Sequence, residues 1–419
     1  MIITKTAIKR AFAVVTALAL ILMSLMITAA SDGMEPDEDE AEVGANVLTG
    51  AEALSSEADA VQTTALSLNA KSVILMEAST GRVLYESNAD ERLRPASVTK
   101  IMTILLVMEA IKAGTISYDD IVSVSENAAS MGGSQVYLEP GEQMSVEELL
   151  KCVIISSAND ASVALAEHVA GSEEAFIQRM NERAEQLGMK NTHFVNTSGL
   201  DDAPESDKHL TSARDVAIMS RELINNHPDV FKYSTIWMDT IRNGAFGLTN
   251  TNRLIRFYRG ATGLKTGSTS KAGFCISATA ERDGMSLIAV VMASPTRDIR
   301  NEAAKTLLDY GFANFCVYST EGGSAGLIPV TGGVAPTAEA HYDKFSVVLP
   351  KGKDKNVVEE IKLNESVAAP VNEGDEVGVV TYTLDGEVIG TVPITAANSV
   401  AKIGYGGLLL RLIRSFLLN

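Results

Sequence analysis

The chain lacks the features that mark several common classes of protein. Its three cysteines, at positions 152, 275 and 316, form an odd and widely spaced set, which provides neither a disulfide framework nor a zinc-site pattern. Positive charge is also scarce, since 35 Lys and Arg face 53 Asp and Glu and the formal net charge is −18. An acidic chain argues against nucleic acid as a partner, because phosphate binding requires a basic surface. Neither a Walker-type phosphate loop nor a GxGxxG dinucleotide motif is present.

The N-terminus has the layout of an export signal. Lys5, Lys9 and Arg10 precede an apolar run over residues 11–30 that ends in small residues, as in a cleavable signal peptide. We therefore expect residues 1–30 to be a signal peptide and the rest of the chain to be exported. The apolar run is nearly long enough to span a bilayer, so an uncleaved anchor remains the alternative.

An acidic segment follows the predicted signal. Residues 31–70 contain ten Asp or Glu and no Lys or Arg, and a stretch so charged and so poor in aromatics cannot pack a core. We expect a disordered spacer over residues 31–67. With 419 residues, of which 46% are hydrophobic, the chain is long enough for two folded domains after this spacer.

The pattern from residue 68 to residue 316 predicts an α+β domain. Strands are expected at residues 73–76, 83–85, 273–279 and 286–292, the first two joined by a turn. Helices are expected at residues 101–113, 146–156, 161–169 and 173–187. The first of these helices is apolar on all sides and is therefore expected to be buried. A block of helices against an antiparallel sheet makes the fold class α+β.

From residue 317 short β runs replace the helical pattern, which predicts a second, all-β domain over residues 317–398. Short β runs lie at residues 345–349, 377–382 and 388–392. Asp385-Gly386, between the last two runs, is a hairpin signal. We expect these runs to form a small β-sandwich.

The last residues, 402–419, predict an amphipathic helix. Its apolar face would consist of six side chains, those of Leu408, Leu409, Leu412, Ile413, Phe416 and Leu417. Arg411, Arg414 and Ser415 cluster on the opposite face. Such a helix is too short to span a bilayer but is suited to lying in an anionic membrane surface. A helix packed on the body of the protein is the alternative.

Three short motifs carry the chemistry of the chain. Ser97 and Lys100 form Ser-x-x-Lys, Ser157 and Asn159 form Ser-x-Asn, and residues 265–267 are Lys-Thr-Gly. Each motif alone is common, but in this order they indicate a serine acyl-transfer site whose base is a lysine. A serine hydroxyl needs a base to become a good nucleophile, and the five histidines of the chain form no recognisable triad.

Lys100 can serve as this base only if its pKa is lowered. Burial and a second cation both have that effect, and the sequence provides a buried helix together with Lys265 of the third motif. The backbone N–H groups of Ser97, near a helix start, and of Ser268 are candidate donors to an oxyanion. Gly267 would let a substrate backbone come close.

The other candidate residues suit the leaving group and the substrate. Ser157 would pass a proton between the lysine and the leaving amine, and the amide of Asn159 would hold the substrate backbone. The third-motif lysine and Thr266 suit a free carboxylate. Either Arg297 or Arg300 would add charge to the same pocket, and a solvated surface position is the alternative for both.

Together with the segments around them, these motifs resemble the low-molecular-mass penicillin-binding proteins that are serine-type D-alanyl-D-alanine carboxypeptidases. The resemblance runs from about Leu66 to the C-terminus and includes residues 94–103, 191–200, 212–215 and 263–274. It implies a transpeptidase- or β-lactamase-like domain, then a small β domain, then an amphipathic membrane anchor.

The resemblance also implies an activity. It assigns Ser97 as the acylated nucleophile, Lys100 as the base and Ser157 as the proton relay. Four residues would bind the substrate, namely Asn159, Lys265, Thr266 and Arg300. The expected reaction removes the last D-alanine from a peptidoglycan stem pentapeptide through an acyl-enzyme that water hydrolyses, and it requires no metal or organic cofactor. β-Lactams would acylate the same serine. The expected location is the outer face of the cytoplasmic membrane, where the C-terminal helix would hold the protein peripherally.

Three alternatives remain open. A β-lactamase would need an efficient deacylation base such as a loop glutamate, for which the sequence offers no evident equivalent. A DD-endopeptidase or transpeptidase would share the acyl-enzyme. A non-catalytic wall-binding or β-lactam-sensing protein is disfavoured because all the catalytic groups are present. This chain has Ser268 where some members of the family have His or Tyr, so its substrate preference and its rate of deacylation can differ from theirs. Ala158 stands where many members have Gly, and we expect this difference to have little effect on the site.

Overall fold

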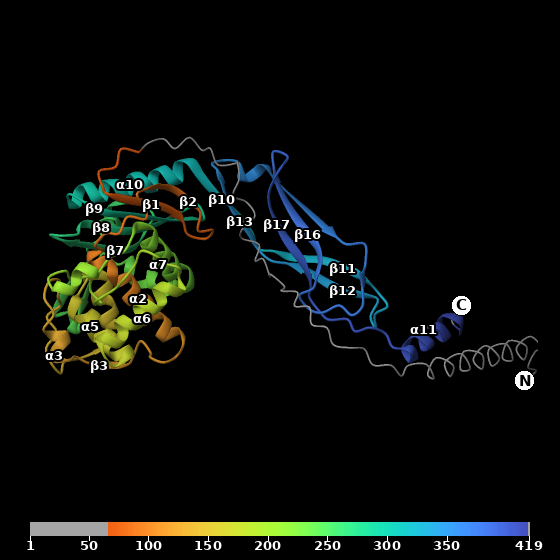
Figure 1. Cartoon of the computed structure of the whole chain (residues 1–419), viewed down its shortest axis with the longest axis horizontal. Helices are drawn as coiled ribbons and strands as arrows, with labels where there is room; N and C mark the ends of the chain where they lie inside the picture. The colour runs from red at the N-terminus through yellow and green to blue at the C-terminus, as the bar shows by residue number, and fades with distance from the viewer. Residues whose placement is uncertain (1–65, 418–419) are drawn as a thin grey trace, which may run out of the picture. The chain divides into compact units, whose positions relative to one another are not determined.

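A five-stranded antiparallel sheet organises the first part of the chain. The computed structural model describes residues 66–417 (Figure 1), so the predicted signal peptide at 1–30 and nearly all of the predicted spacer at 31–67 lie outside the described residues. The strand order is β2-β1-β9-β8-β7. Their bounds are Ser72–Glu77 for β1, Val83–Ser87 for β2, Ala261–Thr269 for β7, Gly273–Arg282 for β8 and Met285–Ser294 for β9. The four strands expected from the sequence are confirmed, and β7 becomes the edge strand that carries the third motif.

Both faces of this sheet are buried, which explains the continuous apolar runs in β1 and β9. Ile74 and Met76 enter the core on one face, whereas Val73 and Leu75 enter a second core on the other face. This alternation follows from the two-residue period of a strand. Figure 1 shows α10 (Arg297–Asn314) on one face and a block of helices on the other.

The helical block contains the helices predicted from the sequence. Its long members are α2 (Lys100–Lys112), α4 (Val146–Lys151), α5 (Asn159–Ala170), α6 (Glu173–Gln186) and α7 (Ala213–Asn226). Nine residues of α2 are buried, as expected for a helix without a polar face. Short elements complete the domain, namely β3 (Ile121–Ser123), β4 (Gln143–Ser145), β5 (Met238–Ile241), β6 (Phe246–Thr249), α3 (Glu126–Ala129), α8 (Phe231–Ser234) and α9 (Leu254–Phe257).

The second part of the chain is all β. A six-stranded sheet has the order β14-β16-β17-β12-β11-β15, and β10 and β13 form a separate two-stranded ribbon. The bounds are β10 (Phe315–Thr320), β11 (Gly323–Thr331), β12 (Thr337–Tyr342), β13 (Phe345–Pro350), β14 (Val357–Leu363), β15 (Val367–Ala368), β16 (Glu376–Leu384) and β17 (Glu387–Ala396). Phe345 of the ribbon stacks on Tyr382 of the sheet, with ring centroids 4.1 Å apart. The all-β prediction is confirmed, while the domain boundaries at 316 and 398 stay predictions.

The predicted hairpin between β16 and β17 is present. Leu384 pairs with Glu387, and the two residues between them, Asp385 and Gly386, have φ values of 51° and 91°. Two positive φ angles define a type I′ turn, whose twist matches that of the flanking strands, and Asp-Gly is among the pairs that adopt it most readily.

The C-terminal helix is also present, as α11 (Tyr405–Leu417). Its apolar side chains are exposed, for example 86% for Phe416 and 50% for Leu412. On the basic face, Arg411 Nη2 donates hydrogen bonds to the carbonyl oxygens of Gly333 and Val334. Within residues 66–417, none of the helices combines the length and the apolarity required to cross a bilayer.

Candidate active site

The first motif brings a serine and a lysine into contact. Ser97 lies in a 3-10 turn, Ala96–Thr99, which follows Pro95 and leads directly into α2. Proline is suited to such a start because its fixed φ and missing N–H are tolerated there. Lys100, one turn later, places Nζ 2.9 Å from Ser97 Oγ. The contact expected from the three-residue spacing is therefore present.

The surroundings of Lys100 favour the neutral amine. Its side chain is fully buried, and Nζ donates to Asn159 Oδ1 at 2.6 Å and to Ser198 O at 2.8 Å. Burial, followed by the nearby charge of Lys265, lowers the pKa of Lys100 well below its ordinary value. Both oxygens can only accept hydrogen bonds, so a neutral amine uses its two N–H groups on them. Its lone pair then remains for the Ser97 hydroxyl proton.

The second motif comes from the end of α4. A π-helical turn, Cys152–Ser156, continues this helix and ends at Ser157, whose φ of 64° turns the chain sharply toward α5. Ser157 Oγ accepts a hydrogen bond from Lys265 Nζ at 2.8 Å. Burial, followed by the charge of Arg300, lowers the pKa of Lys265 to about 7. The second and third motifs therefore meet at a serine hydroxyl and a lysine that titrates near neutrality.

Asn159 lies behind these groups. Its Oδ1 accepts from Lys100, and its Nδ2 donates to the Gly132 carbonyl at 2.7 Å. The residue is 2% exposed. These contacts favour a role in positioning Lys100, and the substrate contact expected for Asn159 stays a prediction.

The third motif lies on edge strand β7, against the turn that carries Ser97. A Cβ at Gly267 would stand 2.7 Å from Ser97 N and 2.9 Å from both Pro95 O and Val98 N. Glycine is therefore required for the strand to approach the nucleophile's own backbone, rather than only for access of a substrate as expected. This close contact brings the N–H of Ser97 near the segment that contains Ser268.

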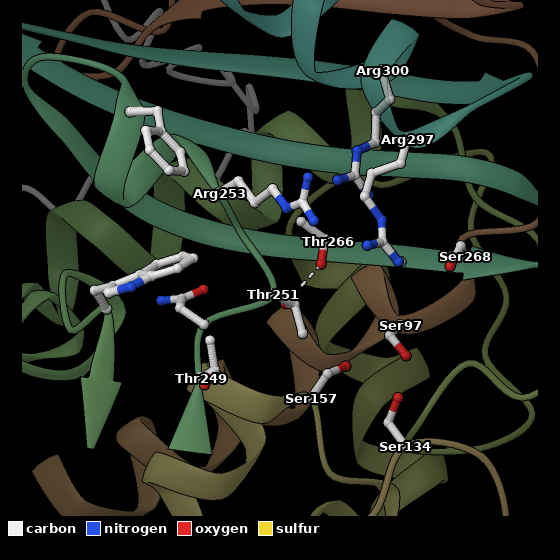
Figure 2. A pocket seen from close by; sticks show the side chains of 14 residues that line it. Ser97, Ser134, Ser157, Thr249, Thr251, Arg253, Thr266, Ser268, Arg297 and Arg300 are labelled. Atoms are coloured by element: carbon white, nitrogen blue, oxygen red, sulfur yellow. Dashed lines mark hydrogen bonds between the residues drawn. The ribbon is translucent and has the colours of Figure 1, made fainter. Parts of the chain in front are cut away.

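An open cleft of about 580 Å³ joins the three motifs. Its lining includes the expected Ser97, Ser157, Thr266, Gly267 and Ser268, together with Ser134 and three arginines, Arg253, Arg297 and Arg300. Figure 2 shows these arginine side chains gathered around Thr266, opposite the hydroxyls of Ser97, Ser134 and Ser157.

The three arginines differ in their surroundings. Arg300 is 3% exposed and donates to Asn301 Oδ1 and to the Cys275 carbonyl. Burial and the charge of Arg297 lower the pKa of Arg300 to about 10. Arg253 and Arg297 are exposed, and among the residues that the structure describes neither has a carboxylate partner. The solvated alternative is therefore wrong for Arg300, while Arg297 faces the cleft and water together.

Arg253 and Ser134 are missing from the sequence-based set. Neither belongs to one of the three motifs, and only the fold brings them to the cleft. A weak signal was present for Arg253, since it ends a polar run, residues 249–253, that begins at the last residue of β6. Asn252 fixes this run by donating from Nδ2 to the Gly263 carbonyl on β7.

A serine hydroxyl in contact with a buried lysine, at the junction of a helical block and a sheet edge, defines a serine hydrolase whose base is not histidine. Comparison with known proteins specifies the class. A family model described as D-alanyl-D-alanine carboxypeptidase matches residues 58–296, and one described as the C-terminal domain of penicillin-binding protein 5 matches residues 341–402. The chain belongs to the S11 peptidase family of D-alanyl-D-alanine carboxypeptidases, as the sequence resemblance predicted.

Individual relatives agree with this assignment. The chain is 41% identical over 370 residues to the D-alanyl-D-alanine carboxypeptidase DacF of Bacillus subtilis (strain 168), an alignment that covers 87% of this chain and 94% of the relative. Crystal structures of penicillin-binding protein 5 from Haemophilus influenzae are similar, with a TM-score of 0.71 and 34% identity over 80% of this chain and 99% of the other. The ampicillin-bound form of penicillin-binding protein D2 from Listeria monocytogenes is also similar, with a TM-score of 0.54 and 33% identity over 59% of this chain and 99% of the other.

Proposed function

We propose that the cleft releases the terminal D-alanine from peptidoglycan stem pentapeptides, with Ser97 as the nucleophile. The observation that carries the proposal is the contact of 2.9 Å between Ser97 Oγ and Lys100 Nζ, made by a lysine whose other hydrogen bonds go to two carbonyl oxygens. This environment keeps Lys100 neutral and ready to accept a proton.

In the acylation step, Lys100 takes the Ser97 proton while Oγ forms a bond to the carbonyl carbon of the scissile peptide. The backbone N–H groups of Ser97 and Ser268 would stabilise the oxyanion of the tetrahedral intermediate. As the C–N bond breaks, Ser157 passes the proton held by Lys100 on to the departing amine of D-alanine, which returns Lys100 to its neutral form. In the second step a water molecule loses a proton to Lys100 as its oxygen attacks the ester carbon. Lys100 then gives this proton to Oγ as the ester C–O bond breaks, which releases Ser97.

Positive charge beyond the scissile bond favours an exopeptidase. Thr266, Lys265 and Arg300 would receive the carboxylate of the terminal D-alanine, because a fixed cation and a hydroxyl suit this anion. A substrate without a free carboxylate at this position would leave these cations unpaired. Among residues 66–417, the side chains that line the cleft include no carboxylate, so the site offers no deacylation base of the kind a β-lactamase of this class uses.

We also propose that β-lactams acylate Ser97. The ampicillin-bound form of the Listeria monocytogenes protein supports this proposal, because that protein shares the first domain of this chain at 33% identity.

The proposed location is outside the cytoplasm, with α11 lying in the outer surface of the cytoplasmic membrane. The exposed apolar face of α11 and the two arginines opposite it support this arrangement.

The function is tested by mass spectrometry of a D-Ala-D-Ala pentapeptide incubated with the protein, with and without penicillin. The expected product is one alanine shorter, and penicillin prevents its formation. Ser97→Ala should abolish the reaction, and Lys100→Ala should slow it about a thousandfold, as expected for loss of a general base. Lys305→Ala changes a surface lysine on α10 and serves as the control. Cleavage of cross-linked muropeptides in preference to the pentapeptide would favour an endopeptidase, and rapid turnover of penicillin would favour a β-lactamase.

A further inference from the structure

A buried histidine that the proposed reaction does not use lies beside the turn that carries Ser97. His209 is 3% exposed, and its Nε2 is 2.8 Å from Thr99 Oγ1. Thr99 is fully buried, and its hydroxyl donates to the Ala96 carbonyl at 2.8 Å. A chain of hydrogen bonds thus connects His209 to the residue that directly precedes Ser97.

The direction of these hydrogen bonds follows from the donors present. His209 Nδ1 accepts from the Val195 backbone N–H at 3.0 Å, so in the neutral ring the proton is on Nε2. Nε2–H then donates to Thr99 Oγ1, which donates its own proton to Ala96 O. Burial lowers the pKa of His209 to about 3, and this keeps the ring neutral at physiological pH.

Ala96 has a backbone conformation that needs such support. Its φ is 49°, in the left-handed region that residues with a Cβ adopt only at a cost. The surroundings leave it little freedom, because a Cβ at Gly199 would stand 1.8 Å from Ala96 O. The hydroxyl of Thr99 and the backbone of Gly199 therefore both lie against the Ala96 carbonyl.

The loop of residues 195–199, which includes Gly199, also holds Lys100. Val195, which donates to His209, is separated by only two residues from Ser198, whose carbonyl accepts from Lys100 Nζ. Thr197 O between them accepts hydrogen bonds from Thr103 on α2 and Ser162 on α5. His209 therefore connects the loop that orients the lysine to the turn that orients the serine.

We propose that His209 is a positioning residue for acylation, which acts through the Thr99 hydroxyl to hold the left-handed Ala96 backbone and so presents Ser97 Oγ to Lys100. The inference rests on the proposed role of Ser97 as the acylated nucleophile. Loss of the hydrogen-bond chain lets the Ala96 carbonyl rotate. The Ser97 side chain and its N–H then lose their alignment, although the cleft that binds the substrate remains.

The first test compares two substitutions of Thr99 in the full chain. Thr99→Val keeps the shape of the side chain and removes the hydroxyl, whereas Thr99→Ser keeps the hydroxyl. The rate constant of acylation by a fluorescent penicillin should fall about tenfold in Thr99→Val, the effect of one lost hydrogen bond with its partners left unpaired. It should stay within about threefold of wild type in Thr99→Ser. The dissociation constant of the initial non-covalent complex should change little in either variant, because the hydroxyl does not line the cleft.

The second test separates the two sides of the His209 ring. In His209→Gln the side-chain amide can still donate to Thr99, whereas in His209→Asn it can accept from Val195 but cannot reach Thr99. The proposal expects Gln to preserve the acylation rate constant better than Asn, by about fivefold, at similar thermal stability. If His209 only supported the fold, the acylation rate constant would fall in each variant in parallel with its loss of thermal stability.

The outcomes separate this inference from the proposed function. If wild-type protein is not labelled at Ser97 at all, the proposed function fails and the roles of Thr99 and His209 do not arise. If the wild type is labelled and Thr99→Val acylates as fast as Thr99→Ser, the positioning role is wrong. Because the rate constant is measured on the fraction that reacts, partial unfolding of a variant does not change this reading.

Discussion

Ser157 Oγ accepts a hydrogen bond from Lys265 Nζ at 2.8 Å, across 108 positions of the sequence. The bond joins the serine proposed to protonate the leaving amine to a lysine whose pKa is lowered to about 7. Lys100, in contact with Ser97, must be neutral to act as a base. Activity therefore requires a charged Lys265 and a neutral Lys100, so the two lysines limit the rate at opposite ends of the pH range. Their contributions to the rate can be separated by its pH dependence.

The pH dependence of kcat/KM should show these opposite demands. Lys265 is a cation below its pKa, so its attraction for the substrate carboxylate is lost as the pH rises through about 7. Lys100 becomes active as the pH rises through its lowered pKa. We expect a bell-shaped profile with an alkaline limb that belongs to Lys265. In Lys265→Arg this limb should move upward by at least about two pH units, because arginine stays charged. An unchanged alkaline limb would show that another group titrates there.

Burial of Lys100 should make stability depend on pH. The native pKa lies below the unfolded value, so between the two the unfolded chain binds a proton that the native protein does not. The free energy of unfolding should therefore rise with pH from the lowered native pKa of Lys100 up to the ordinary lysine pKa, by up to about 1.4 kcal/mol per pH unit from this residue. Lys100→Met lacks this contribution and should show a smaller slope. Urea unfolding followed by fluorescence of Trp237, the single tryptophan, reports on this domain, and equal slopes would contradict the assignment.

Gly267 should tolerate no side chain. A methyl group there would meet three backbone atoms of the turn that carries Ser97, all within 2.9 Å, and backbone cannot move aside as a flexible side chain can. Gly267→Ala should therefore slow acylation at least tenfold, about 1.4 kcal/mol or more in activation free energy. Gly247→Ala on β6, where a Cβ would meet nothing within 4 Å, is the matched control. Wild-type acylation by Gly267→Ala would mean that the turn and β7 do not pack as described.

Much of the fold could be predicted from the sequence because its signals are local. Residues 73–76 of β1 and 287–293 of β9 are apolar at every position, and α2 has no polar face, so each predicts a buried element without knowledge of its partners. Asp385-Gly386 predicted its hairpin because the turn itself requires two residues that adopt positive φ.

The site was predictable only where a motif stands on one element. Ser97 and Lys100 meet because they are three residues apart at the start of one helix. Arg253, marked only by the polar run that it ends, and the contact between His209 and Thr99 depend on chain segments that only tertiary packing brings together. The orientation of Asn159 toward Lys100 likewise follows from the left-handed turn at Ser157, which the sequence does not encode by a glycine.

Arg297 should contribute to recognition of the substrate carboxylate without supporting the fold. It lines the cleft and is exposed, whereas Arg300 is buried and hydrogen-bonded to Asn301 and Cys275. Arg297→Ala should raise KM about threefold to tenfold for a peptide with a free terminal carboxylate, and it should leave hydrolysis of the matching C-terminal amide unchanged. Thermal stability should stay within about 0.5 kcal/mol of wild type. Equal effects on both peptides would show that Arg297 does not sense the carboxylate.

The membrane role of α11 can be tested by a truncation that the structure defines. Lys402 and Ile403 pair with residues 332–333 of the β domain, so a chain that ends at Gly404 keeps these contacts and loses only the helix. This truncated protein should no longer sediment with vesicles that contain anionic lipid, yet it should hydrolyse a soluble pentapeptide at the wild-type rate. Leu412→Asp with Phe416→Asp in the full chain should have the same effect, because charges on the apolar face oppose burial in the lipid surface.

Arg414→Glu should weaken binding mainly at low ionic strength, since screening already reduces this attraction at high salt. Sedimentation of the truncated protein with the vesicles would place the membrane contact elsewhere in the chain.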